Sequence, residues 1–316
     1  MKSIFFSFLL TLLLVFSNEN SLAQEIKDIK VTKSEVLKAK MGSKIDEIGV
    51  YYPPEAAPEY PESFAIGKNE EIYILDKANE RIQVFKNVKR IKTIPIPFES
   101  FEDIALTPDG KIVLLDNIVK NSVYIINSKG KTVSVISLVG ELISYAPEVT
   151  SVKVIESGRW AGIWVEIDSG SIKIANLDGS KTKRIAVPGI FFDDGTRIYE
   201  IKRIGNATYM LYLYEKDSLS KFDELSIFLN EFICGIGPIG TDEKGRIYLH
   251  VTSGENYSLD YVLIISSNLE IIGKFKIVLS PIQHPLRVTK EGHVYQLYLD
   301  EKMRKVNFLK YEPKID

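Results

Sequence analysis

Six residues have side chains suited to binding or chemistry, and they are Glu62, Glu102, Asp103, His284, Tyr52 and Tyr60. Carboxylates and imidazoles bind cations and exchange protons, and aromatic rings contact sugars and peptides. These residue types therefore suit a divalent cation or a polar ligand. They can act together only if the fold brings residues 62, 102–103 and 284 to one place.

An internal repeat indicates a fold of that kind. Six times, a strand-like run leads through a tight polar turn into two further strands, in which β-branched and aromatic residues alternate with polar ones. The turns of successive copies are centred on Glu70, Gly110, Gly158, Gly205, Gly245 and Gly292. Their mean spacing is about 44 residues, which is the length of a four-stranded propeller blade.

Outer strands and ring closure complete the expected architecture. A fourth, outer strand is predicted at residues 90–96, 132–138, 183–187 and 271–278. The last repeat, 286–311, ends after its third strand, so residues 35–41 are expected to supply its outer strand. The sequence thus predicts an all-β, six-bladed β-propeller of four-stranded antiparallel blades, closed by pairing of the N- and C-terminal strands. Such closure removes exposed sheet edges.

The first repeat carries a family resemblance. It reads Phe-Ala-Ile at 64–66, Ile-Tyr-Ile-Leu-Asp at 72–76 and Asn-Glu-Arg-Ile-Gln-Val-Phe at 79–85. This pattern resembles an NHL repeat, a family of usually six-bladed propellers. The second copy keeps Asp116 but departs from the pattern at residues 120–122. The resemblance implies that Asp76 and Arg81 tie neighbouring strands together and take no part in chemistry.

The first residues predict the compartment. Lys2 precedes an apolar run at 4–16, and the small residues Ser21 and Ala23 suit cleavage of a signal peptide between Ala23 and Gln24. Thirteen residues cover about 20 Å as a helix, short of a bilayer core of about 30 Å. We therefore expect a signal peptide at 1–23, a ring-closing strand and proline-rich linker at 24–59, and the propeller at 60–316. The mature protein is expected to be secreted or periplasmic, without a transmembrane segment.

Composition narrows the partners. The formal net charge is −2 at pH 7, so the chain lacks the basic field that nucleic acids require. Cys234 is the single cysteine, which excludes an intramolecular disulfide. Stability must then come from a packed core, which a hydrophobic content of 45% can build.

Two functions fit these features. The first is a binding or scaffolding module, without a cofactor, for a protein, carbohydrate or small molecule at the loop face of the channel, where the linker 51–60 would form a lid or aromatic patch. The alternative is a metal-assisted lactonase, hydrolase or lyase, with Glu62, Glu102, Asp103 and His284 around calcium or zinc at the channel mouth. Related six-bladed enzymes use an early Glu, two Asn and a late Asp, or several histidines around zinc. The sequence has neither set, which favours the binding module.

Overall fold

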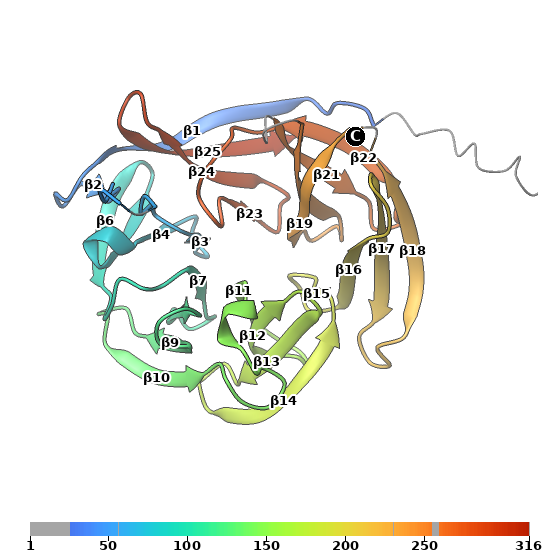
Figure 1. The fold of residues 1–316 in the computed structure, drawn as a ribbon, viewed down its shortest axis with the longest axis horizontal. Coiled ribbons are helices and arrows are strands. Elements are labelled where there is room, and N and C mark those ends of the chain that lie inside the picture. The colour runs from blue at the N-terminus through green and yellow to red at the C-terminus, as the bar shows by residue number, and fades with distance from the viewer. Residues whose placement is uncertain (1–25, 56, 230, 255–258, 316) are drawn as a thin grey trace, which may run out of the picture.

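The computed structural model describes residues 26–55, 57–229, 231–254 and 259–315. The predicted signal peptide and its cleavage site lie outside these residues. The described chain forms a ring of six antiparallel blades (Figure 1). The predicted fold class is therefore confirmed. Within the described residues, no helix is long and apolar enough to cross a membrane.

The first three blades follow one another along the chain, each with its innermost strand first. Blade 1 consists of β3 (Phe64–Ile66), β4 (Ile72–Asp76), β5 (Arg81–Lys86) and β6 (Lys89–Pro95), with the 3-10 helix η2 (Lys77–Asn79) between its second and third strands. Blade 2 consists of β7 (Asp103–Leu106), β8 (Ile112–Asp116), β9 (Ser122–Ile126) and β10 (Thr132–Ser137). The 3-10 helix η3 (Ala146–Glu148) then leads into blade 3, which consists of β11 (Ser151–Ile155), β12 (Gly162–Ile167), β13 (Gly170–Ala175) and β14 (Lys181–Pro188).

The remaining blades keep the same order until the ring closes. Blade 4 consists of β15 (Ile190–Phe191), β16 (Arg197–Arg203), β17 (Thr208–Glu215) and β18 (Lys221–Phe228). Blade 5 consists of β19 (Ile233–Thr241), β20 (Ile247–Ser253), β21 (Leu259–Ile265) and β22 (Ile271–Lys276). Blade 6 consists of β23 (Leu286–Val288), β24 (Val294–Asp300), β25 (Lys305–Pro313) and the N-terminal β1 (Val31–Met41), with the short β2 (Glu47–Ile48) added in parallel outside it.

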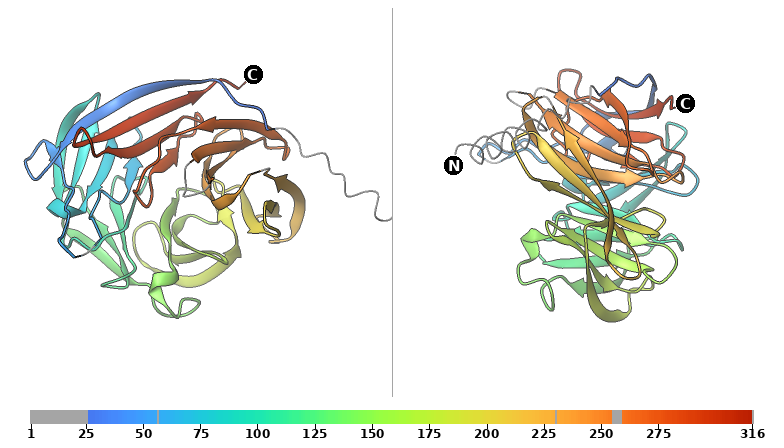
Figure 2. Two further views of the ribbon diagram at one scale, coloured as in Figure 1. Left: turned by 45° about the horizontal axis from the view of Figure 1, so that its top comes forward. Right: turned by 90° about the vertical axis from the view of Figure 1, so that its right-hand side faces the viewer.

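Pairing of the two ends of the chain closes the ring. β1 runs antiparallel to β25, from Val31 opposite Pro313 to Lys40 opposite Lys305, with a register shift after Glu35. Figures 1 and 2 show β1 lying along the outer side of β25. The predicted role of residues 35–41 as the missing outer strand is confirmed, and the strand begins earlier, at Val31.

One predicted turn was wrong. Gly205 lies between β16 and β17, the second and third strands of blade 4. The innermost strand β15 has only two residues, and its hairpin to β16 turns at residues 192–195, where the amide of Gly195 donates to the carbonyl of Phe192 at 2.8 Å. Tyr209, Tyr212 and Tyr214 lie in β17, the third strand of blade 4. Because the first strand is so short, the repeat pattern did not indicate the hairpin that follows it.

The six inner hairpins share a backbone conformation that explains the glycine pattern. Five carry glycine with φ between 69° and 84°, as at Gly110 and Gly195. Glycine adopts this left-handed region without a Cβ clash. Blade 1 places Glu70 there instead, at φ 59°.

The core lies between the blades. Six clusters of buried apolar side chains each join two neighbouring sheets, so that every blade packs on both of its faces. Between blades 3 and 4, for example, the rings of Trp164 and Phe191 meet edge to face with centroids 4.7 Å apart. The inner strands are thereby held rigidly around the axis.

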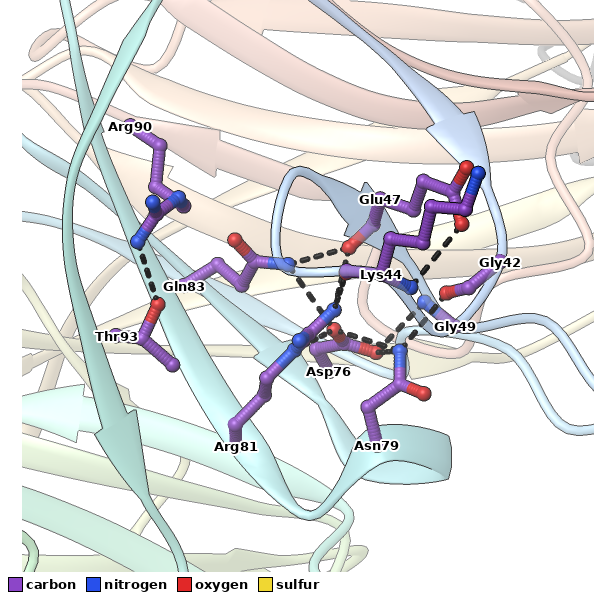
Figure 3. A network of polar contacts seen from close by, with 10 residues as sticks. All are labelled: Gly42, Lys44, Glu47, Gly49, Asp76, Asn79, Arg81, Gln83, Arg90 and Thr93. Carbon is purple, nitrogen blue, oxygen red and sulfur yellow. Dashed lines mark hydrogen bonds and ion pairs between the residues drawn. The ribbon is translucent and has the colours of Figure 1, made fainter.

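A buried carboxylate anchors the ring-closing segment to blade 1 (Figure 3). Asp76 accepts a hydrogen bond from the amide of Gly49 at 2.7 Å and one from Arg81 Nε at 2.7 Å. Asn79 donates to both Asp76 and the carbonyl of Gly42. Asp76 and Arg81 thus hold the chain from β1 to blade 1, in keeping with the structural role that the sequence implied.

Candidate functional site: the central channel

The six innermost strands surround a cavity of about 1270 Å³. We name the end of the propeller where these strands begin the loop face, and the end where they turn into the second strands the hairpin face. Residues from all six blades line the cavity. A cavity of this size exceeds most pockets for a single small ligand, and its walls belong to rigid strands.

Asp103 stands at the loop-face end of β7 and is fully buried. Its carboxylate accepts hydrogen bonds from Ser63 Oγ at 2.6 Å, Arg287 Nη2 at 2.7 Å and the amide of Val152 at 3.0 Å. Burial alone would raise the pKa of Asp103, but the charges of His284 and Arg287, with the hydrogen bonds, lower it below its usual value. Asp103 therefore ties blades 1, 2, 3 and 6 together as a buried anion.

Lys77 links the other two predicted acids. Its ammonium lies 2.8 Å from Glu62 Oε1 and 3.5 Å from Glu102 Oε1. Burial alone would lower the pKa of Lys77, but the two carboxylates outweigh burial and raise it. Burial raises the pKa of Glu102, Lys77 opposes that shift, and Glu62 adds to it. Both carboxylates are thus engaged by a cation of the chain itself.

His284 borders both groups. Its amide donates to the carbonyl of Glu62 at 3.0 Å, and its side chain lines the cavity. The imidazole Nε2 is buried and has no hydrogen-bond partner within the described residues. The structure thus gathers Glu62, Glu102, Asp103 and His284 at one region of the loop face, as the repeat pattern predicted.

The two tyrosines of the linker lie elsewhere. The linker folds back on itself, with two hydrogen bonds between the backbones of Tyr51 and Glu59. The Tyr52 and Tyr60 rings meet edge to face with centroids 6.4 Å apart. Burial and the nearby Glu301 raise the pKa of both phenols. Neither side chain is among those that line the cavity.

The geometry does not favour these residues as metal ligands. Within the part of the chain that the structure describes, no three His, Cys, Asp or Glu side chains converge as a metal site requires. The oxygens of Glu62, Glu102 and Asp103 already face Lys77 or Arg287.

The cavity carries further carboxylates that sequence reasoning missed. Twelve acidic and four basic side chains line it. Six of the acids have no ion pair within the described residues, and they are Glu70, Glu156, Glu166, Asp168, Asp194 and Glu243. Among the four lining cations, Lys68 alone lacks an ion pair within the same residues. The channel therefore holds an excess of negative charge.

This excess is concentrated on one side. Blades 3, 4 and 5 contribute Glu156, Glu166, Asp168, Asp194 and Glu243, which we name the acidic side. Blades 6, 1 and 2 contribute Asp103 and Arg287 to the cavity wall, whereas Glu62, Lys77 and Glu102 lie at the loop face and do not line the cavity; we name these five residues the paired side. The sequence held no signal that distinguishes the acidic side, because an acid precedes the hairpin glycine in blades 2 and 6 as well as in blades 3, 4 and 5.

Tyr199 stands in the wall beside the acidic side. The residue is 1% exposed and lines the cavity, and its hydroxyl has no hydrogen-bond partner within the described residues. Burial raises the pKa of Tyr199 well above its usual value, and the carboxylates of Asp193 and Glu166 raise it further. A buried phenol without a partner costs about 1–3 kcal/mol, and the Tyr199 ring packs edge to face against Phe192 in the core between blades 4 and 5.

A second, smaller cavity of about 450 Å³ lies between blades 5 and 6. There His250 Nε2 lies 3.4 Å from Asp260 Oδ1. Residues 279–283 and 285, in the segment that leads to β23, also line it.

Comparisons with known proteins find distant likenesses among solved structures and no family. No protein-family model and no curated protein matches the sequence. A catalytically inactive virginiamycin B lyase from Staphylococcus aureus aligns over 89% of this chain and 99% of its own, with 12% identity and a TM-score of 0.48. A gluconolactonase from Xanthomonas campestris aligns over 79% and 86%, also with 12% identity and a TM-score of 0.48. Likeness at this level carries no argument about activity, and the NHL resemblance stays a prediction.

Proposed function

We propose that this protein is an exported binding module that holds a small polar ligand in its central channel. The observation that carries the proposal is the cavity of about 1270 Å³, with walls from all six blades and six carboxylates that have no ion pair within the described residues. Rigid walls limit the ordering cost of binding. Export is supported by the apolar run and small residues at 4–23, and intact-mass measurement of the secreted protein should place its first residue at Gln24.

The alternative, a metal-assisted hydrolase or lyase, is less well supported. The acids assigned to it are engaged by Lys77 and Arg287, so a metal would have to displace an internal cation. Calorimetric titration with calcium and zinc tests it directly. Stoichiometric metal binding that is lost in Glu102→Gln would favour the enzyme over the binding module.

A blocked channel tests the binding module. Thr150 is exposed and lines the cavity. A larger side chain at this position would narrow the channel, so Thr150→Trp should abolish ligand binding. Thr132→Trp on the outer strand β10 is the matched control, because Thr132 is exposed and lies away from the axis. The probes are a neutral sugar, an organic diacid and an organic amine. If no probe gives binding that Thr150→Trp abolishes and Thr132→Trp preserves, the small-ligand proposal fails and a protein partner becomes the better explanation.

A further inference from the structure

The outer strand of blade 2 differs in charge from the other outer strands. β10 reads Thr-Val-Ser-Val-Ile-Ser and carries no charged residue. The outer strands β6, β14, β18, β22 and β1 each carry two or more. Charged residues on an edge strand oppose its pairing with other chains. β10 lacks this protection, although it is the outermost strand of its sheet and lies on the outside of the ring (Figure 1).

Exposed apolar side chains concentrate in blade 2 and in the segment that follows it. Of the 20 large apolar side chains that are exposed within the described residues, seven lie between residues 118 and 145. Two of them, Val133 and Val135, belong to β10 itself and are 49% and 52% exposed. Apolar side chains that gather in one part of a protein surface mark an interaction site.

The open edge of β10 is centred on Val135. The amide of Leu138 donates to the carbonyl of Asn121 at 2.8 Å, so the backbone of Leu138 bonds toward the inside of the blade. Backbone groups alternate in direction along an antiparallel strand. The N–H and C=O of Val135, three residues before Leu138, therefore point outward.

Two features limit the length of this edge. The register of β10 shifts after Thr132, where the strand has a bulge or irregularity. At the other end, the Arg184 guanidinium donates to the carbonyl of Ser137 at 2.6 Å. A pairing partner therefore meets a short edge around Val135, which suits a reversible association.

The charges that flank β10 indicate the occupant of this edge. Lys129 and Lys131 are exposed at the hairpin-face end of the strand, and Glu141 is exposed beyond its loop-face end. When two β10 strands pair antiparallel about Val135, the lysines of each copy lie at the same end as Glu141 of the other. Lys129 is then level with Glu141 of the second copy, because each lies six residues from Val135. Opposite charges meet at both ends, and neutral residues meet between them.

We propose that two copies of this protein associate through blade 2, with their β10 strands paired antiparallel around a twofold axis at Val135. The outward N–H of each Val135 donates to the Val135 carbonyl of the other copy, and the exposed valines of β10 are removed from water. The same surface patch serves both copies, as a twofold contact requires. The channel takes no part in this contact, so the inference does not depend on the proposed ligand.

Sedimentation velocity of the purified protein at about 1–100 µM tests the inference. A concentration-dependent dimer is expected. Val135→Lys should raise its dissociation constant about tenfold, because it places two like charges opposite each other and removes apolar contact. Ile91→Lys is the matched control, since Ile91 is 52% exposed, as Val135 is, and lies on β6, the outer strand of blade 1. This variant should dimerise as the natural protein does.

A charge exchange tests the antiparallel register. Lys129→Glu and Glu141→Lys should each weaken the dimer about threefold, because like charges then meet at its ends, and the double variant should restore it. Both side chains are exposed, so these changes leave the fold intact. A protein that stays monomeric up to about 100 µM would overturn the inference, as would a dimer that withstands Val135→Lys or is equally weakened by Ile91→Lys. A double variant that dimerises no better than the single ones would refute the antiparallel pairing.

Discussion

The two sides of the channel treat acidic residues in opposite ways. On the paired side, Asp103 receives four hydrogen bonds, and Lys77 holds Glu62 and Glu102. On the acidic side, residues such as Glu156 and Asp168 have no ion pair within the described chain. The difference teaches that an acid near the axis is not in itself a ligand site. Where a lysine or arginine of the chain pairs with the acid, the acid stabilises the packing of neighbouring blades. Where no such cation pairs with it, the acid is available to a ligand.

The largest expected contrast is between two aspartates. Asp103→Ala leaves Arg287 and the Val152 amide without their buried partner, so the free energy of unfolding should fall by about 3–5 kcal/mol. Asp168→Ala, on the exposed acidic side, should change it by less than about 0.5 kcal/mol. Urea unfolding measures both. Similar losses of unfolding free energy in the two variants would contradict the distinction between the paired side and the acidic side.

A second contrast concerns lysines. Lys77→Met removes the cation between Glu62 and Glu102 and should cost about 2 kcal/mol, less than a fully buried pair because the Lys77 side chain is 13% exposed. Lys68→Met is the control, since Lys68 is exposed and its ammonium, within the described residues, donates to the carbonyl of Pro108 and has no ion pair. Thermal unfolding of the two variants distinguishes them, and an unchanged midpoint in Lys77→Met would contradict the structural role of the cluster.

Acid should weaken the paired side selectively. The pKa of Asp103 is lower in the folded protein than in the unfolded chain, where an aspartate has a pKa of about 3.9. Its charge therefore contributes stability that is complete above the unfolded pKa and is lost as the pH falls through the folded pKa. Unfolding free energies measured from pH 5 to pH 2.5 should show a smaller acid loss in Asp103→Asn than in the natural protein. Parallel curves would refute this assignment.

The smallest expected effect on the free energy of unfolding concerns the hydroxyl groups of Tyr248 and Tyr199. Tyr248 donates a hydrogen bond to Asp242 at 2.9 Å, so Tyr248→Phe should lower the free energy of unfolding by about 1 kcal/mol. Tyr199→Phe removes a hydroxyl that has no hydrogen-bond partner among the described residues and should leave stability unchanged or slightly increased. Denaturant midpoints of the two variants report the difference. An equal loss in Tyr199→Phe would mean that its hydroxyl has a partner in the folded protein.

Much of the fold could be predicted, because turns impose strict local demands. Four of the six inner hairpins were found from glycine at a position of positive φ and a fifth from Glu70, which aligns with those glycines, and the missing strand of the last repeat was correctly assigned to the N-terminal segment. The inner hairpin of blade 4 was not predicted correctly, because the first strand of this blade is two residues long and a later hairpin also carries a glycine, Gly205. A glycine in the sequence predicts a turn, but it does not indicate which two strands that turn connects.

The site was harder to predict, because ion pairing depends on distant residues. Glu62, Glu102, Asp103 and His284 do gather at the loop face, yet Arg287, which neutralises Asp103, lies at the far end of the sequence. Tyr199 has an ordinary strand sequence around it, and only the structure shows its hydroxyl without a partner. Which acids remain free is decided by packing between blades, which no local pattern contains.

The pairing of β1 with β25 also sets an order of events. A chain made from its N-terminus can form five blades before the last strand exists, but β1 must wait for residues 305–313. Such distant pairing is intrinsically slow, so closure should be the late step of folding. Until then, β1 and the unfinished sixth blade offer open strand edges to other chains. A chain that lacks residues 305–313 cannot pair β1 with β25, so it keeps these strand edges exposed.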